Sequence, residues 1–232
     1  MGAKYTIVLN ASNLRGGGAV QVAVSLISEL LHMPIKGDIV LILSSVVFRE
    51  CTAIGVDFKD FRALHQIDHF GFKPFNKGLQ KIFRGADLVF TVFGPLYLWR
   101  RPKISVVGFA QPWILYPGSE AYQALPRSKR AVTRLKYAAQ QYFFRRNSNM
   151  MIVEAEHAQK RLAALFPNLP VVVVPNALNG VFLDAISSDR SKALAKPVLP
   201  PHHSVRHVTL GHVGRAYSHF PPFAKRYGNG MA

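Results

Sequence analysis

The sequence is poor in cysteine and in carboxylates. Cys51 is the single cysteine among 232 residues, which excludes an internal disulfide and a metal cluster built on thiolates. Lysine and arginine number 29 and aspartate and glutamate only 12, so the formal net charge is +17. A balance of this kind indicates an anionic partner, which can be a nucleic acid, an acidic membrane surface or a phosphorylated substrate.

Long apolar runs are also missing. No stretch approaches the roughly 18 apolar residues that cross a bilayer, and the longest candidate, residues 39–48, is interrupted by Ser44 and Ser45. The apolar stretch at residues 5–9 is too brief for a signal peptide. We therefore expect a reduced cytoplasmic protein. A folded core is expected as well, because 49% of the residues are hydrophobic and 11% are aromatic.

Short apolar runs alternate with helical patterns along most of the chain. The runs lie at residues 5–9, 39–43, 87–93, 104–109, 150–153 and 171–174, and the helical patterns at 20–31, 77–83, 127–146 and 157–166. This alternation predicts an α/β fold with a doubly wound, mostly parallel, Rossmann-like sheet. We expect this domain to occupy residues 1–183, followed by a Pro- and Ser-containing linker at 184–206. Residues 207–232 resemble the first strand and turn of a second α/β domain, which we expect to be incomplete.

Glycines and aromatic residues follow the expected strands, at the edge where open α/β sheets bind ligands. Gly16, Gly17 and Gly18 stand between the first strand and the first helix, where a loop without Cβ atoms lets backbone N–H groups approach a ligand. Phe109, Gln111 and Trp113 follow another strand, and such side chains can stack on sugars and bind hydroxyl groups. A plain turn and ordinary packing are the alternatives for the two groups.

The helical pattern at 127–146 is basic and amphipathic. Residues 121–150 contain no carboxylate. Val132, Leu135, Ala139 and Tyr142 share one stripe, and Arg127, Arg130 and Arg134 are expected on the opposite side of the helix. The pattern favours docking on anionic lipid, and an ordinary surface helix is the alternative. His202, His203 and His207 have no carboxylate or cysteine nearby, so we expect no metal site there.

Several segments together resemble glycosyltransferase family 4 enzymes of bacterial surface-polysaccharide synthesis. They are Asn10–Leu14 leading into Gly16–Ala23, FGPLYLW, VVGFAQPWILYP, MMIVEAEHAQKRL and VVVVPNALNGVF. The resemblance covers residues 4–183 and implies one half of a two-domain fold of the type called GT-B. It implies retaining transfer of a sugar from a nucleotide-sugar, without metal or cofactor, to an acceptor on a polyprenyl lipid. It adds Glu156 to the substrate-binding residues and implies a location at the inner face of the cell membrane.

The resemblance weakens in the donor-side half. The family grips the donor diphosphate with an arginine and a lysine, and Gly214-Arg215 matches the first of these. Ser218-His219-Phe220 stands where the lysine is expected, and no carboxylate follows Asp189 to match the family's glutamate pair. We therefore expect the chain as written to transfer no sugar. The alternatives are a basic nucleic-acid-binding protein, against which no RNA-binding signature appears, and a non-catalytic module that docks on membranes or binds glycans.

Overall fold

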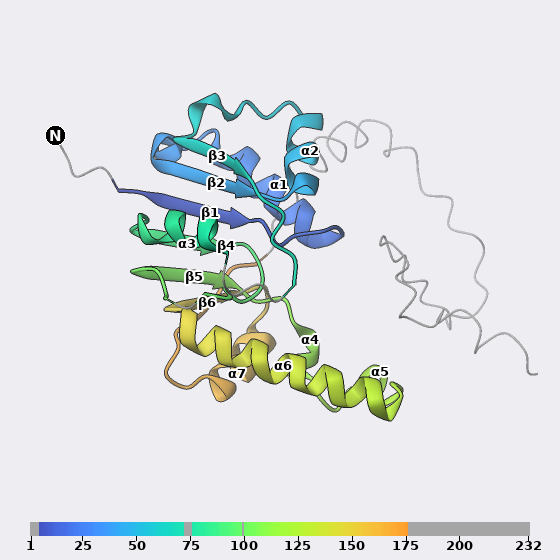
Figure 1. Ribbon diagram of the computed structural model, residues 1–232. Coiled ribbons are helices and arrows are strands. Elements are labelled where there is room, and N and C mark those ends of the chain that lie inside the picture. Colours follow the sequence, from blue (N-terminus) through green and yellow to red (C-terminus); the bar gives the residue numbers. More distant parts are fainter. Residues whose placement is uncertain (1–4, 72–75, 99, 176–232) are drawn as a thin grey trace, which may run out of the picture. The chain divides into compact units, whose positions relative to one another are not determined.

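The computed structural model of the protein describes residues 5–71, 76–98 and 100–175. Seven strands form one sheet in the order β3-β2-β1-β4-β5-β6-β7, and every pair of neighbours is parallel (Figure 1). The strands are β1 (Ile7–Ala11), β2 (Ile39–Leu43), β3 (Ala63–Gln66), β4 (Leu88–Thr91), β5 (Ile104–Gly108), β6 (Met150–Val153) and β7 (Val171–Val173). The predicted doubly wound, Rossmann-like α/β fold is confirmed.

Helices connect most of the strands. They are α1 (Gly18–Leu30), α2 (Ser45–Ala53), α3 (Lys77–Arg84), α4 (Pro112–Leu115), α5 (Glu120–Gln123), α6 (Arg127–Asn147) and α7 (Glu156–Leu165). Two 3₁₀ turns, η1 (Pro34–Asp38) and η2 (Phe58–Asp60), precede β2 and β3. Every strand and helix expected from the sequence within residues 5–175 is present. The sequence analysis missed α2, the two short helices α4 and α5, and β3.

The two faces of the sheet bury alternate residues of the same strands. Leu9, Leu41 and Leu43 pack with α1 and α2 on one face, whereas Val8 and Ile42 pack with Leu79 and Phe83 of α3 on the other. Strand side chains alternate between faces, so the continuous apolar run of β2 serves both cores. This is the pattern that a sheet covered on both sides requires.

A third cluster lies under the second half of the sheet. Val107, Met151 and Val153 pack with Phe144 of α6 and Leu162 of α7. The register pairs Val107 with Thr91 of β4, two residues from Val89 on the α3 side, so α6 and α7 cover the same face as α3. On the opposite face β5 leaves Ile104 49% exposed, and the edge strand β7 leaves Val172 40% exposed.

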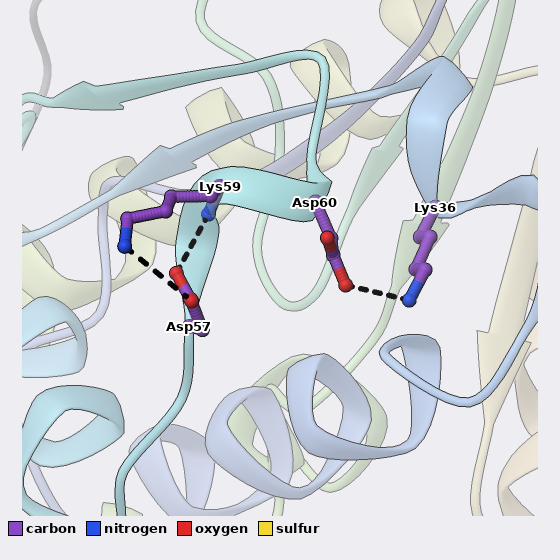
Figure 2. Close-up of polar contacts among 4 residues, drawn as sticks. All are labelled: Lys36, Asp57, Lys59 and Asp60. Carbon is purple, nitrogen blue, oxygen red and sulfur yellow. Dashed lines mark hydrogen bonds and ion pairs between the residues drawn. The ribbon is translucent and has the colours of Figure 1, made fainter.

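The connections on the β3 side are held by exposed ion pairs (Figure 2). Lys36 Nζ lies 2.6 Å from Asp60 Oδ2, which ties η1 to η2. The Asp57 side chain accepts from the Lys59 backbone N–H at 3.0 Å and so caps η2, while the two charged groups are 3.9 Å apart. Exposed pairs contribute about 0–1 kcal/mol each, so they position the loop more than they stabilise the fold.

The remaining predicted segments fall outside the described residues. They are residues 176–183 of the expected first domain, the expected linker at 184–206 and the expected start of a second domain at 207–232, including Arg215.

Candidate functional site

The carboxyl ends of β1 and β4 form the topological switch point of the sheet. These strands are hydrogen-bonded neighbours, but the chain runs from β1 toward β3 on one side and from β4 toward β7 on the other. Loops that leave two such strands diverge, and the crevice between them is where open α/β sheets bind ligands. The three-glycine loop follows β1 at this point.

The glycine loop leaves the amino end of α1 open. Gly17 is the N-cap residue of α1, with φ 70° and ψ −161°. Because it has no side chain, no side-chain hydrogen bond caps the helix. A Cβ atom added at Gly16 or Gly18 would meet nothing within 4 Å. Since the first N–H groups of a helix lack intrahelical partners, this loop can present backbone donors to a polar ligand. The structure therefore places Gly16, Gly17 and Gly18 at the switch point.

The amide side chains of Asn10 and Asn13 connect the carboxyl ends of β1 and β4. Asn10 is buried and donates from Nδ2 to Thr91 Oγ1 at 3.2 Å, while its Oδ1 accepts from the Ser12 hydroxyl at 2.7 Å. Asn13 donates from Nδ2 to the Phe93 carbonyl at 2.7 Å. These bonds join the ends of β1 and β4 and hold the loop that precedes the glycines.

A small cavity lined by both polar and apolar side chains lies beside these asparagines, on the α3 side of the sheet. Its volume of about 20 Å³ suits one water molecule, which needs at least roughly 10–15 Å³. Asn13 Oδ1 is buried without a partner among the described residues. Burial raises the pKa of Tyr97, which keeps its phenol neutral. The lining residues are Asn10, Asn13, His69, Asn76, Leu79, Phe83 and residues 95–98.

The loops after β4 and β5 approach each other closely. Gly94 has φ 90° and its N–H donates to the Gly108 carbonyl at 3.0 Å. A Cβ atom at Gly108 would lie 1.8 Å from the Val92 carbonyl oxygen. The second glycine therefore serves close packing of backbone rather than contact with a ligand.

The aromatic residues after β5 pack against neighbouring helices, with Phe109 buried and Trp113 half-buried. Phe109 is only 4% exposed, and its ring centroid lies 5.0 Å from that of Phe144. Trp113 contacts Tyr122 and Tyr137 edge to face, at 5.7 and 6.2 Å, and so joins α4, α5 and α6. Gln111 is half-buried at the start of α4 and makes no side-chain cap bond there. Of these three residues, Gln111 keeps a polar group at the carboxyl edge.

Glu156 occupies the first turn of α7, three residues after the last residue of β6. It is exposed, and a carboxylate in that position is stabilised by the positive end of the helix dipole. The site residues of the first domain thus share the carboxyl edge, although β1 and β6 are separated in the sheet by β4 and β5. Any single ligand that met the glycine loop and Glu156 would have to span those two strands.

Helix α6 turns an apolar stripe outward. Val132 is 70%, Leu135 74% and Tyr142 55% exposed. The side of the helix that faces the protein is largely polar and consists of half-buried Thr133 and Tyr137 with buried Gln140, Phe144 and Asn147. Asn147 Nδ2 donates to the carbonyls of Leu96 and Leu98 at 2.6 and 3.0 Å. The helix therefore attaches through the buried Phe144 ring, the packed Tyr137 ring and amide bonds.

Basic residues flank the outward stripe on both sides. Arg127 and Arg134 are about two turns apart, and Arg145 follows after about three more turns, so they share one flank. The prediction that Arg127 and Arg134 lie opposite the stripe is therefore wrong, because at about 100° per residue both fall beside it. Lys129 and Lys136 share the other flank, again about two turns apart. All five are exposed. Arg130 instead lies half-buried and donates to the Leu125 carbonyl at 3.3 Å, so it belongs to the side that faces the protein.

The site has features that the sequence analysis missed. It did not select Asn10, Asn13, His69 or Asn76, which line the cavity at the switch point. The signal for the first two was present, since polar residues directly after a buried strand lie at the ligand-binding edge. No sequence signal brings His69 there, because it follows the short strand β3. The two basic flanks of α6 could have been recognised from the two-turn spacing of the basic residues.

Within the described residues, no helix is both long and apolar enough to span a membrane. Nor do those residues contain a group of histidine, cysteine and carboxylate side chains able to hold a metal ion. The sequence matches no known protein-family model and no curated protein.

Proposed function

We propose that this protein docks on an anionic membrane surface through α6 and acts there as the acceptor-side domain of a sugar-transferring enzyme. The observation that carries the proposal is the outward stripe of Val132, Leu135 and Tyr142, between basic flanks. A helix with an apolar stripe bordered by lysine and arginine is suited to the boundary between lipid headgroups and acyl chains.

The free energies that the charges and apolar side chains of α6 can contribute are sufficient for reversible binding to a membrane. Each lysine or arginine near an anionic surface contributes about 1 kcal/mol, so the five flanking residues together contribute about 5 kcal/mol. Full burial of a large apolar side chain contributes about 1.5–3 kcal/mol, so partial insertion of three such side chains adds a similar amount. The electrostatic share falls with salt, because the Debye length is only about 8 Å at physiological ionic strength.

The position of α6 supports an acceptor that is carried by lipid. Its first half, with α4 and α5, extends past the ends toward which the strands point (Figure 1). The first half of the docking helix and the carboxyl-edge crevice thus lie toward the same edge of the sheet (Figure 1). A saccharide on a polyprenyl lipid would reach the crevice from the membrane, where the Gly16–Gly18 loop, Gln111 and Glu156 supply donors and acceptors for sugar hydroxyls.

A nucleic-acid partner fits this face less well. The charge of +17 suits it, but the outward side chains at the centre of the face are aliphatic at Val132 and Leu135. Binding to single strands relies on aromatic side chains that stack on bases, and binding to duplexes relies on contacts to phosphates and to base edges. Aliphatic side chains gain more from lipid than from either.

The docking is tested by co-sedimentation with vesicles. The protein should bind vesicles that contain phosphatidylglycerol, bind neutral phosphatidylcholine vesicles weakly, and dissociate in high salt. The double variant Arg127→Glu/Arg134→Glu should lose binding. A matched control, Lys81→Glu/Arg84→Glu, changes the charge by the same amount on exposed positions of α3 and should retain most of it. Equal losses in the two variants, or stronger binding to tRNA than to vesicles in physiological salt, would contradict the proposal.

The acceptor role needs its own assay. A polyprenyl-linked saccharide in nanodiscs should change the fluorescence of Trp113 when Trp99 is replaced by phenylalanine. Replacing Gln111 with alanine should weaken this response without affecting vesicle binding. If the saccharide-free lipid gives the same response, the acceptor role is wrong while the docking role stands.

A further inference from the structure

A larger hollow lies at the opposite edge of the sheet, where β5, β6 and β7 begin. Its volume of about 520 Å³ is in the range of small-molecule sites. We call it the amino-edge groove. It is lined by Arg101, Arg145, Ser148, Asn149 and residues 166–169. Because these residues precede the strands, the groove is separate from the crevice at the carboxyl edge.

Two guanidinium groups line this groove without a carboxylate. Arg145, in the last turn of α6, donates one weak bond from Nη2 to the Leu165 carbonyl at 3.4 Å and stands 5.7 Å from the centre of the Phe166 ring. A guanidinium has five N–H donors, so most of them are available. The ion pairs found among the described residues all lie elsewhere on the protein.

Neutral polar groups complement the two arginines. Ser148 is 4% exposed, and its hydroxyl has no hydrogen-bond partner among the described residues. Asn149 Oδ1 accepts from the Ser105 N–H at 3.0 Å, so its amide NH₂ remains as a donor group. Buried polar groups without partners are uncommon in folded proteins. The groove thus combines two cations and further donors with an apolar wall formed by residues 166, 167 and 169.

We propose that the amino-edge groove binds a phosphate monoester. Planar guanidinium groups match phosphate oxygens in paired hydrogen bonds, and the wall at residues 166, 167 and 169 contacts the organic part of the ligand. The phosphate can belong to a soluble metabolite or to the headgroup of phosphatidic acid. The headgroup is within reach because Arg145 also borders the outward stripe of α6. The groove itself does not depend on the proposed membrane function.

Calorimetry with glycerol 3-phosphate tests the soluble source. The protein should bind this probe, and Arg101→Gln/Arg145→Gln should bind it at least about tenfold more weakly, since each charge-assisted hydrogen bond carries roughly that factor. The control Arg127→Gln/Arg134→Gln removes the same charge from the docking flank and should bind the probe normally. Equal weakening in both variants would mean diffuse attraction by a basic protein and would overturn the proposal.

Vesicles test the lipid source. If glycerol 3-phosphate does not bind, the proposal requires a preference for phosphatidic acid over phosphatidylserine at equal vesicle charge, and this preference must vanish in Arg101→Gln/Arg145→Gln. Absence of both responses would refute it. A second variant, Asn168→Asp, serves if Arg101→Gln/Arg145→Gln unfolds, because it changes only one exposed position. It places a carboxylate in the groove, which should abolish binding by repelling the phosphate. Loss of vesicle binding in Arg127→Glu/Arg134→Glu with normal binding of the probe would leave both proposals standing.

Discussion

Helix α6 offers the sharpest test of the structure, because its outward stripe and its buried side predict opposite effects of similar substitutions. Phe144 is fully buried and packs on Phe109 in the third core cluster. Replacing it with alanine should lower the free energy of unfolding by about 3–5 kcal/mol. Leu135 is 74% exposed, so Leu135→Ala should change that free energy by less than about 0.5 kcal/mol.

Urea unfolding followed by circular dichroism measures both values. The Phe144→Ala change should appear as a lower midpoint at unchanged slope, and in a thermal scan as a melting temperature lower by about 6–20 °C, at roughly 2–4 °C per kcal/mol. Leu135→Ala should unfold like the parent protein and yet sediment less with anionic vesicles. A loss of about 2 kcal/mol or more in Leu135→Ala would show that this side chain is buried, and the docking proposal would fail with it.

Three further predictions concern other parts of the fold. Burial raises the pKa of Cys51 to about 12, so a thiol reagent should modify it only after unfolding, and fast modification of the native protein would contradict its burial. A hydrogen bond from Lys103 lowers the pKa of Asp87. Stability from this pair is therefore present above the unfolded pKa, about 3.9, and is lost as pH falls through the lower folded pKa. Asp87→Asn should flatten the acid limb of the unfolding curve, and an unchanged limb would refute the role. Gly108→Ala should cost about 1–3 kcal/mol, measured by urea unfolding, because its Cβ atom would overlap the Val92 carbonyl.

The candidate site could be predicted in part from the sequence. Strand β1 ends in Asn10 and Ala11, strand β5 ends in Gly108, and both are apolar runs followed by turn residues. The carboxyl ends of these strands could therefore be located, and with them the three-glycine loop and Gln111. What could not be foreseen is that Phe109 and Trp113 pack inward. An aromatic residue after a strand can face a ligand or a neighbouring helix, and the choice depends on where α6 lies.

The sequence by itself determined the class of the fold and the type of most elements. Apolar runs such as β2 and β6 coincide with the strands residue for residue, because a central parallel strand must be apolar on both faces. Ser44 interrupts the longer apolar stretch at residues 39–48, and in the structure its side chain caps α2 by accepting from the Val47 N–H at 3.3 Å. The edge strand β3 is half-exposed and carries no comparable pattern.

Only the tertiary structure decided which face of α6 meets the core. Periodicity shows that Val132, Leu135 and Tyr142 share a stripe, but it does not show the direction in which that stripe points. The contacts of Phe144 with the sheet and of Asn147 with the carbonyls after β4 orient the helix, and both depend on strands far away in the sequence. Since the buried Phe144 ring, the packed Tyr137 ring and the Asn147 amide bonds outweigh three exposed apolar side chains, the stripe faces outward.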